Sequence, residues 1–401
     1  MYNVIVLSWG DSLNKKYLTS KTTGTIKIES ETCVVIKQGS TINASLNVND
    51  YVTDKMFFYD ASGRENGRSL FYAIDKENIE LTAERNGIIN GQGKVANTKG
   101  TNAVPGLIRF VNCKNIKITN LTLIDSAFWG IYLQNCENIE INGLTIVSKW
   151  CSNNFGICID SSKNVDISNC TFDTGDDAIS IRTTSKVPCE NITINNCEIS
   201  SVWSAIKLGT ESVGDFKNIT FKNCLVKQAL GCALKVAVVD GGQVDGLLID
   251  NIKMQNVTGP IFIVNGFRNA KYYEEDNDSE NISKINNVTI KNVFADVIAS
   301  QSHFSQEVGD CVFVSGRPNA KINGLTIENC EFNMPGGNLV ENDYLVEELL
   351  DQYPEYYSLG LSPSFGAYFR HVENLKLKDV KIKEKEEDIR EKIIFEDVTL
   401  C

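Results

Sequence analysis

The sequence predicts a right-handed parallel β-helix, an all-β solenoid in which one chain winds through successive coils. Three observations predict it. A phrase close to Asn-Ile-x-Ile-x-Asn recurs, and its first five marker asparagines stand 23, 26, 27 and 27 residues apart. Apolar and polar residues alternate with a period of two inside each copy, as in a strand with one buried face. Asn, Gly and Asp break the alternation at fixed offsets, where the chain must turn.

The copies of the phrase follow one another along most of the chain. Each predicts one strand of one coil, and we expect about nine or ten coils of roughly 22–28 residues. Solenoids grow by adding coils, so residues 1–401 are predicted to form a single domain. The repeated asparagines are expected to stack as a ladder. The copies begin at Asn115, Asn138, Asn164, Asn191, Asn218, Val244, Asn287, Asn323 and Asn374.

Two segments interrupt this rhythm. Residues 267–283 are polar and acidic, and residues 334–369 carry Pro335-Gly-Gly and an acidic, aromatic stretch. Both are predicted to be loop insertions, and long loops on a rigid scaffold are where binding residues are usually found.

Composition excludes two classes of partner. The chain has no apolar run near the 18 or so residues that span a bilayer, so no membrane partner is expected. Its net charge of −12 repels phosphate backbones, so no nucleic acid is expected either. Residues 1–16 do not have the pattern of a signal peptide, and the chain as given is expected to be cytoplasmic. The sequence does not predict an oligomeric state.

The thirteen cysteines are expected to serve packing. Cys170, Cys197 and Cys224 recur every 27 residues, which places one small apolar side chain in the same slot of each coil. Disulfides and a metal site are the less favoured alternatives, because no CxxC pair with a second half is present. No cofactor is predicted.

The strongest chemical signal is the pair Asp176 and Asp177, which follows the turn residue Gly175. Two adjacent carboxylates at a turn can face a cleft as a general acid and a base. The same pair could also be turn-capping aspartates or ligands of Ca²⁺. The residues by themselves leave these alternatives open.

Over nearly its whole length the sequence resembles glycoside hydrolase family 28, the polygalacturonases and their relatives. That resemblance implies a carbohydrate substrate and inverting hydrolysis of an α-linked uronate chain, by two carboxyl groups about 6.5–9.5 Å apart. It implies that Asp176 is the general acid and that Asp177 helps to hold the attacking water. The motifs that carry it are Ile89-Asn-Gly-Gln-Gly, Phe128-Trp-Gly-Ile, Asn154-Phe-Gly-Ile-Cys-Ile-Asp, Thr174-Gly-Asp-Asp-Ala-Ile and, as in a bacterial branch, Ala205-Ile-Lys-Leu-Gly-Thr-Glu-Ser, Leu234-Lys-Val and Tyr353-Pro-Glu.

The chain departs from the family pattern at three positions. Phe155 stands where the second water-binding carboxylate belongs, which halves the expected base. Ser204 replaces the family's histidine, and Ala233 replaces an arginine of the substrate site and leaves only Lys235. We therefore expect weak recognition of a substrate carboxylate and poor cleavage of ordinary polygalacturonate.

Other side chains could compensate for the lost base. Asp160 lies five residues after Phe155, on the opposite parity of an ideal strand, so it reaches the same face only across a bulge and could equally be a turn aspartate. Glu211 and Lys207 could present a carboxylate and an ammonium to the cleft, or be ordinary surface charges. Tryptophans such as Trp203 could stack on sugars or fill the core.

Two functions remain in view. The first is a polygalacturonase-like glycoside hydrolase that cleaves a pectic or related oligo- or polysaccharide with a non-standard base. The alternative is a catalytically degenerate carbohydrate-binding β-helix, since loss of a general base costs about 10²–10⁴-fold in rate. Measured turnover distinguishes them.

Overall fold

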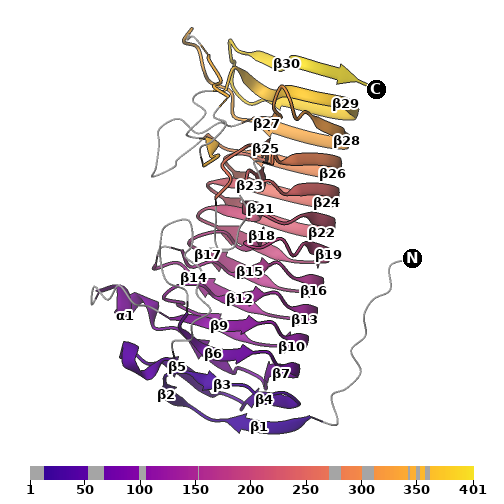
Figure 1. Cartoon of the computed structure of the whole chain (residues 1–401). Helices are drawn as coiled ribbons and strands as arrows, with labels where there is room; N and C mark the ends of the chain where they lie inside the picture. The colour runs from indigo at the N-terminus through magenta and orange to yellow at the C-terminus, as the bar shows by residue number, and fades with distance from the viewer. Residues whose placement is uncertain are drawn as a thin grey trace.

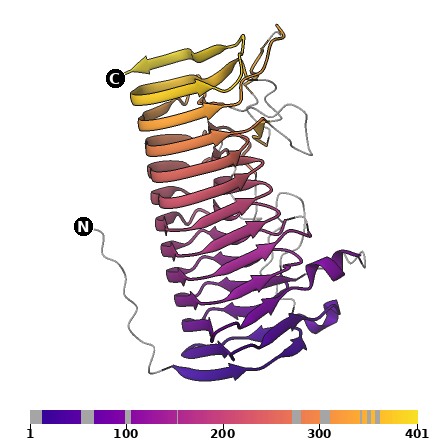
Figure 2. The same ribbon diagram turned by 180° about the vertical axis from the view of Figure 1, so that it is seen from behind.

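The chain folds as a right-handed parallel β-helix, which confirms the predicted fold class (Figure 1). The computed structural model describes residues 13–52, 67–98, 105–151, 153–270, 281–299, 311–341, 344–348, 353–356 and 362–401. Within these ranges all thirty strands join one hydrogen-bonded sheet that winds around the axis of the helix. Two opposite views show the coils stacked in sequence order from β1 to β30 (Figures 1 and 2).

One face of the coils, called here the site sheet, positions the candidate site. Its strands pair in parallel from each coil to the next. In order they are β3 (Ile26–Lys27), β6 (Ser69–Ile74), β9 (Gly106–Val111), β12 (Ile131–Gln134), β15 (Ile157–Asp160), β18 (Ile179–Thr183), β21 (Ser204–Ser212), β23 (Cys232–Val238), β25 (Ile261–Asn265), β27 (Val312–Ser315), the start of β29 (Ser364–Glu384) and β30 (Glu391–Leu400).

The second face carries the repeated phrase. Among its strands, those such as β13 and β16 alternate between buried and partly exposed residues, as the period of two predicts, whereas β4 is buried throughout and β1 is mostly exposed. They are β1 (Asn14–Leu18), β4 (Thr32–Ile36), β7 (Glu77–Ala83), β10 (Lys114–Thr119), β13 (Glu137–Asn142), β16 (Lys163–Ser168), β19 (Cys189–Asn195), β22 (Phe216–Ala229), β24 (Gln243–Val257), β26 (Lys284–Val297), β28 (Ile322–Met334) and part of β29.

The third face is built from short strands in the first coils and from the ends of long strands in the later ones. From β22 onward one strand of 13 residues or more covers both the second and the third face. The short strands are β2 (Lys21–Thr23), β5 (Thr41–Ala44), β8 (Ile88–Asn90), β11 (Thr122–Ile124), β14 (Thr145–Ser148), β17 (Thr171–Thr174) and β20 (Glu198–Ser201).

Two short helices complete the described elements. They are η1 (Val48–Asp50) and α1 (Gly93–Thr98), and no helix among the described residues is long and apolar enough to cross a membrane. The predicted insertions are described only in part, at residues 267–270 and 281–283 and at 334–341, 344–348, 353–356 and 362–369. Most of the N-terminal segment 1–16 likewise lies outside the described residues.

The expected number of coils was too low. The second face stacks twelve strands from β1 to β29, and the count of nine or ten missed the first coils. Asn78 in β7 begins a copy of the phrase that we had not included, whereas β1 and β4 carry no marker asparagine. Glu31, just before β4, has φ 56° and accepts a hydrogen bond from the Asn78 amide, so it takes the place of the marker asparagine at the start of the ladder.

The marker asparagines form the predicted ladder. Asn115, Asn138, Asn164 and Asn191 all adopt left-handed backbone angles, with φ between 55° and 59°. Each side-chain amide donates to the Oδ1 of the asparagine one coil earlier, at 2.8 to 3.1 Å. Asparagine tolerates this backbone conformation because its short polar side chain hydrogen-bonds locally, so the turn and the ladder depend on the same residue type.

The cysteines pack in the core, as predicted. All thirteen are free thiols and eleven are buried. Cys170, Cys197 and Cys224 lie between 1% and 3% exposed in the same slot of three successive coils. These three cysteines therefore pack as small apolar side chains at the same position of the turn in each coil.

The ladder can be tested at an interior position. Asn164→Ala removes the hydrogen bond to Asn138 and the hydrogen bond from Asn191. It also places alanine at φ 57°, a left-handed conformation that alanine cannot stabilise with a side-chain hydrogen bond as asparagine does. We expect a loss of about 2–4 kcal/mol in the free energy of unfolding. Asn164→Gly removes the hydrogen bonds without the backbone strain and should cost less, about 1–2 kcal/mol. Urea denaturation followed by circular dichroism measures both, and equal stability of Asn164→Ala and the parent would contradict the ladder's contribution.

Candidate active site

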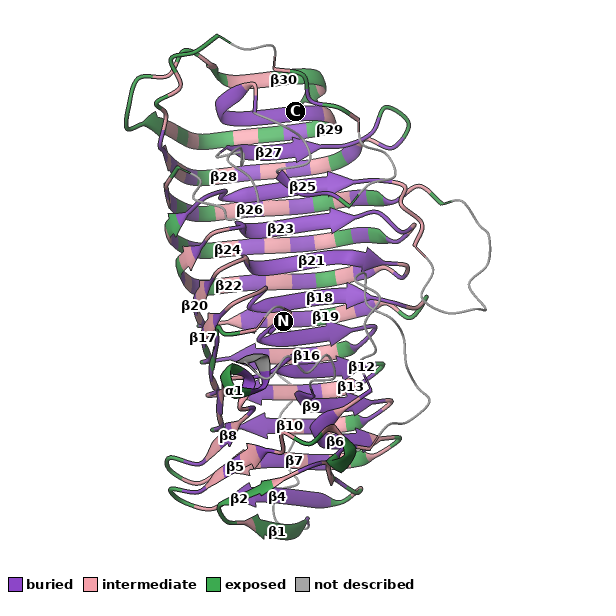
Figure 3. Ribbon diagram, turned by 90° about the vertical axis from the view of Figure 1, so that its left-hand side faces the viewer, coloured by how far each residue is buried: buried purple, intermediate pink, exposed green. Residues whose placement is uncertain are grey.

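The site sheet is buried on both faces around the coils that carry the predicted site. Every residue of β15, β18, β21 and β23 is buried, and the ribbon is coloured as buried along this sheet (Figure 3). Mostly alternate residues of these strands belong to the main apolar core, so the side chains between them point outward. Those outward residues include Asp160, Arg182, Lys207 and Lys235. Charged residues are almost never fully buried unless they are paired, so this stretch is a built polar site.

The predicted pair of aspartates follows Gly175, where a side chain would crowd its neighbours. A Cβ on Gly175 would lie 2.7 Å from the side-chain oxygen of Asn154. Asp176 is partly exposed, and its Oδ1 accepts the Asp177 backbone N–H at 2.7 Å. Asp177 is fully buried: its Oδ1 accepts the Ser204 backbone N–H at 3.3 Å, and its Oδ2 lies 3.4 Å from the Lys207 ammonium. The two neighbours therefore have different environments.

This difference shifts the acidity of Asp176. Burial, reinforced by the negative charge of Asp177, raises the pKa of Asp176 to about 7 against the opposing charges of Lys207 and Arg182. A carboxyl group that keeps its proton near neutral pH can act as a general acid.

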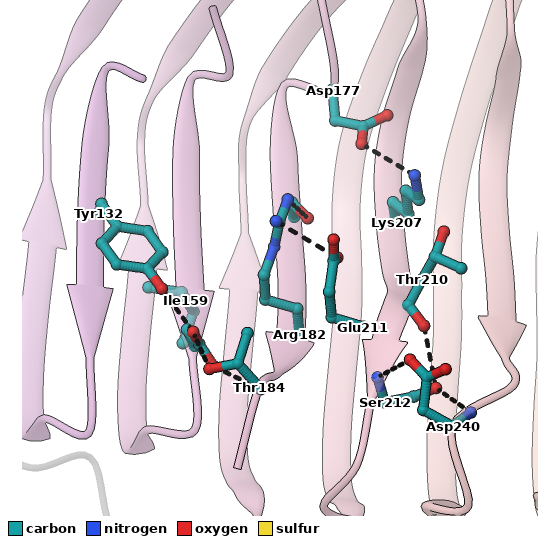
Figure 4. Close-up of polar contacts among 12 residues, drawn as sticks. Tyr132, Ile159, Asp177, Arg182, Thr184, Lys207, Thr210, Glu211, Ser212 and Asp240 are labelled. Carbon is teal, nitrogen blue, oxygen red and sulfur yellow. Dashed lines mark hydrogen bonds and ion pairs between the residues drawn. The ribbon is translucent and has the colours of Figure 1, made fainter. Parts of the chain in front are cut away.

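Glu211 has the opposite environment. Its Oε2 lies 3.2 Å from the Arg182 guanidinium in a buried ion pair (Figure 4). Burial opposes ionisation, but the charges of Arg182, Lys207 and Arg268 outweigh it and hold the pKa of Glu211 below its ordinary value. Glu211 is therefore held as a carboxylate, in the coil that follows the Asp176 and Asp177 pair.

Phe155 packs against the cation that holds Glu211. The Arg182 guanidinium lies 5.0 Å from the Phe155 ring and 5.5 Å from the Trp129 ring, both within cation–π range. Phe155 and Trp129 belong to one buried aromatic cluster. Position 155, where the resemblance predicts the replacement of a carboxylate, is thus part of an aromatic cluster that faces Arg182.

Asp160 reaches the outward face without a bulge. The strand β15 begins at Ile157, so Phe155 precedes it and the parity count between positions 155 and 160 does not apply. Asp160 Oδ2 accepts hydrogen bonds from the Tyr132 hydroxyl at 2.5 Å and the Thr184 hydroxyl at 2.7 Å, and Oδ1 from the Thr184 N–H and the Ser161 hydroxyl, both at 2.9 Å. Burial nevertheless raises its pKa. These contacts favour a structural carboxylate that closes the turn after β15.

The two predicted lysines are side by side. Lys207 and Lys235 are register partners on β21 and β23, 4% and 1% exposed. The Lys207 ammonium donates to the Tyr353 hydroxyl at 2.9 Å, and the Lys235 ammonium forms an ion pair with Glu355. Ser204, at the family's histidine position, is fully buried.

Sequence reasoning missed several charged partners. Arg182 lies two residues after Ser180 on β18. The period of two of a strand therefore predicts that the side chains of Ser180 and Arg182 both point outward. Asp240 accepts a bidentate pair of hydrogen bonds from Arg268 at 2.9 and 2.6 Å, which no local pattern signals. Within the described ranges, no three His, Cys, Asp or Glu side chains are grouped to hold a metal ion.

Comparison with known proteins identifies a family for this chain. Residues 18–340 match the family model described as glycosyl hydrolases family 28. A probable polygalacturonase of Arabidopsis thaliana is 32% identical over 192 residues, covering 46% of this chain and 43% of the relative. A polygalacturonase of Persea americana is 27% identical over 294 residues, covering 70% and 59%. The chain thus spans about half the length of the curated relatives it matches.

A solved structure shows the same fold. The family 28 exopolygalacturonase of Yersinia enterocolitica superposes with a TM-score of 0.68 at 17% identity, over 97% of this chain and 73% of that one. At this identity the likeness concerns the fold.

The unusual acidity of Asp176 has a measurable effect on stability. Native Asp176 keeps its proton up to about pH 7, whereas the unfolded chain releases it near the ordinary value of 3.8, so this group lowers stability as pH rises through that window. Asp176→Asn should therefore be about 1–3 kcal/mol more stable than the parent at pH 8 and equally stable near pH 4.

Asp177→Asn is the matched control, and it should lose stability because it leaves the buried Lys207 without its carboxylate. Denaturation at the two pH values measures both variants. Equal stability of Asp176→Asn and the parent at pH 8 would contradict the raised pKa.

Proposed function

The chain belongs to glycosyl hydrolases family 28, and from that premise we propose that it is a glycoside hydrolase that cleaves a pectic or related oligo- or polysaccharide with inversion at the anomeric carbon. The observation that carries the proposal is the contrast between Asp176, whose pKa is raised to about 7, and Glu211, whose pKa is lowered. Two carboxyl groups whose environments push their pKa values apart are the pattern of an acid and a base.

In the proposed reaction Asp176 donates its proton to the glycosidic oxygen as the bond to the anomeric carbon breaks. Glu211 accepts a proton from the water that attacks the opposite face of the sugar, and Asp177, tied to Lys207, helps to hold that water. Arg182 keeps Glu211 ionised and fixes its position. Asp160 supports the neighbouring turn.

The alternative is a catalytically degenerate protein that binds carbohydrate. It is favoured by one observation, the replacement of the family's second water-binding carboxylate by Phe155. The two proposals differ in turnover, which a screen of reducing-sugar release over pectic and other plant oligosaccharides would detect.

Asp176→Asn tests the acid. The substitution keeps the size of the side chain and removes its proton donor, so we expect turnover to fall by about 10²–10⁴-fold with folding and ligand binding retained. Asp173→Asn is the control: Asp173 lies three residues earlier, pairs with Lys149 outside the site, and should leave the rate within about 2-fold of the parent. Turnover that survives in folded Asp176→Asn protein would remove the acid assignment.

The pH profile tests the division of roles. Asp176 must be protonated, so kcat/KM should fall about tenfold per pH unit above about pH 7. Asp177→Asn removes the charge that helps to raise the pKa of Asp176 and should move this alkaline limb to lower pH. Glu211→Gln should cost about 10²–10⁴-fold throughout the profile. An alkaline limb that Asp177→Asn leaves in place, or a folded Glu211→Gln variant with parental turnover, would contradict the assignment.

A further inference from the structure

Two lysines beside the Asp176 and Asp177 pair are neutralised within the protein. Lys207 lies 3.4 Å from the Asp177 carboxylate, and Lys235 pairs with Glu355 from the second insertion. Arg182 pairs with Glu211 in the same region. These three ion pairs leave no surplus positive charge among their six groups, and Asp176 adds a negative charge when it ionises. Arg268, whose guanidinium lies 5.5 Å from the Tyr353 ring, is itself paired with Asp240.

Aromatic rings lie against both lysines. The Tyr353 ring centre is 5.4 Å from the Lys207 ammonium, and the Trp203 ring centre is 5.1 Å from the Lys235 ammonium. Tyr353 is 37% exposed and Trp203 is partly exposed, whereas the two lysines are 4% and 1% exposed. Solvent therefore reaches the two rings, called here the aromatic platform, and hardly reaches the ammonium groups.

Glu355 is held in place by its neighbour Tyr356. The Tyr356 hydroxyl lies 2.8 Å from the carbonyl oxygens of Ile261 and Cys311, and its ring packs in a tilted arrangement with its centre 4.5 Å from that of Phe262. A Cβ on Gly259 would lie 2.7 Å from the Tyr356 ring, so the glycine makes room for this anchor. Residues 353–356 are thus fixed on the site sheet, with Glu355 directed at Lys235.

From these contacts we infer that Glu355 is a specificity-determining residue that withdraws Lys235 from the substrate, so that the sugar bound over the aromatic platform is an uncharged one. This inference rests on the proposed function. A uronate carboxylate at this place would meet Glu355 and Asp177, while Lys207, Lys235 and the nearby Arg268 are each already paired with a carboxylate. Like charges brought together in this way lower the affinity for the ligand. A neutral sugar instead stacks its apolar C–H face on the exposed rings.

The test compares two ligands that differ in charge and share one linkage, α-1,4-linked trigalacturonate and α-1,4-linked galactotriose. Affinities are measured by calorimetry on Asp176→Asn protein, which does not turn the ligands over. We expect this protein to bind galactotriose at least about 10-fold more tightly than trigalacturonate. Adding Glu355→Ala should free Lys235 and improve trigalacturonate binding by about 10- to 100-fold, the value of a charge-assisted hydrogen bond, with galactotriose changed by less than about 3-fold. Adding Glu328→Ala is the control, because it removes a glutamate paired with Lys378 on the second face and should change neither affinity.

A second variant covers the case in which Glu355→Ala fails to fold, since it leaves a buried ammonium without its partner. Lys235→Met with Glu355→Met removes both charges together and should keep the affinity for galactotriose and the rejection of trigalacturonate. A loss of trigalacturonate affinity in this double variant would show that Lys235 already binds the ligand, and would overturn the inference.

Other outcomes separate the inference from the proposed function. A protein that hydrolyses through Asp176 but prefers trigalacturonate keeps the proposed function and overturns the specificity. Loss of turnover on every substrate in a folded Glu355→Ala variant that keeps Asp176, with both affinities unchanged, would also overturn it and assign Glu355 to catalysis.

Discussion

The fold depends on one constraint, the in-register parallel pairing of each coil with the next. Each position in a coil is placed beside the same position in its neighbours, about 4.8 Å away. Asn138 therefore meets Asn115 and Asn164, and the amide ladder follows from the repeat itself. The same rule builds the site, because Lys207 and Lys235 are neighbours only through the pairing of β21 with β23.

In-register stacking has opposite effects on different side chains. Stacked isoleucines or asparagines stabilise one another, whereas stacked lysines repel and, once buried, lose their hydration. In the site sheet the two stacked lysines are neutralised by carboxylates that lie outside their own strands. Asp177, which pairs with Lys207, comes from the turn before β18. Glu355, which pairs with Lys235, comes from an insertion 120 residues along the chain. The insertion is therefore part of the electrostatics of the site as well as its cover.

The sequence predicted what depends on local repetition. The period of two and the marker asparagines predicted the strands, the ladder and the stacked cysteines, and the assignment of roles to Asp176 and Asp177 stays a prediction from the resemblance. The ion pairs of Arg182 with Glu211 and of Lys235 with Glu355 could not be predicted. The first depends on the course of the chain at the end of β21, and the second on how an insertion returns to the sheet, and neither leaves a pattern in the residues around it.

The contacts of Phe155 with Arg182 change the interpretation of position 155. From the sequence alone, Phe155 is interpreted as the replacement of a carboxylate. In the structure the Phe155 ring and the Trp129 ring face the Arg182 guanidinium. That guanidinium forms an ion pair with Glu211. A carboxylate at position 155 would compete for Arg182 and weaken its hold on Glu211. The aromatic residue at position 155 and the ion pair of Arg182 with Glu211 are therefore physically coupled, because both depend on the same guanidinium.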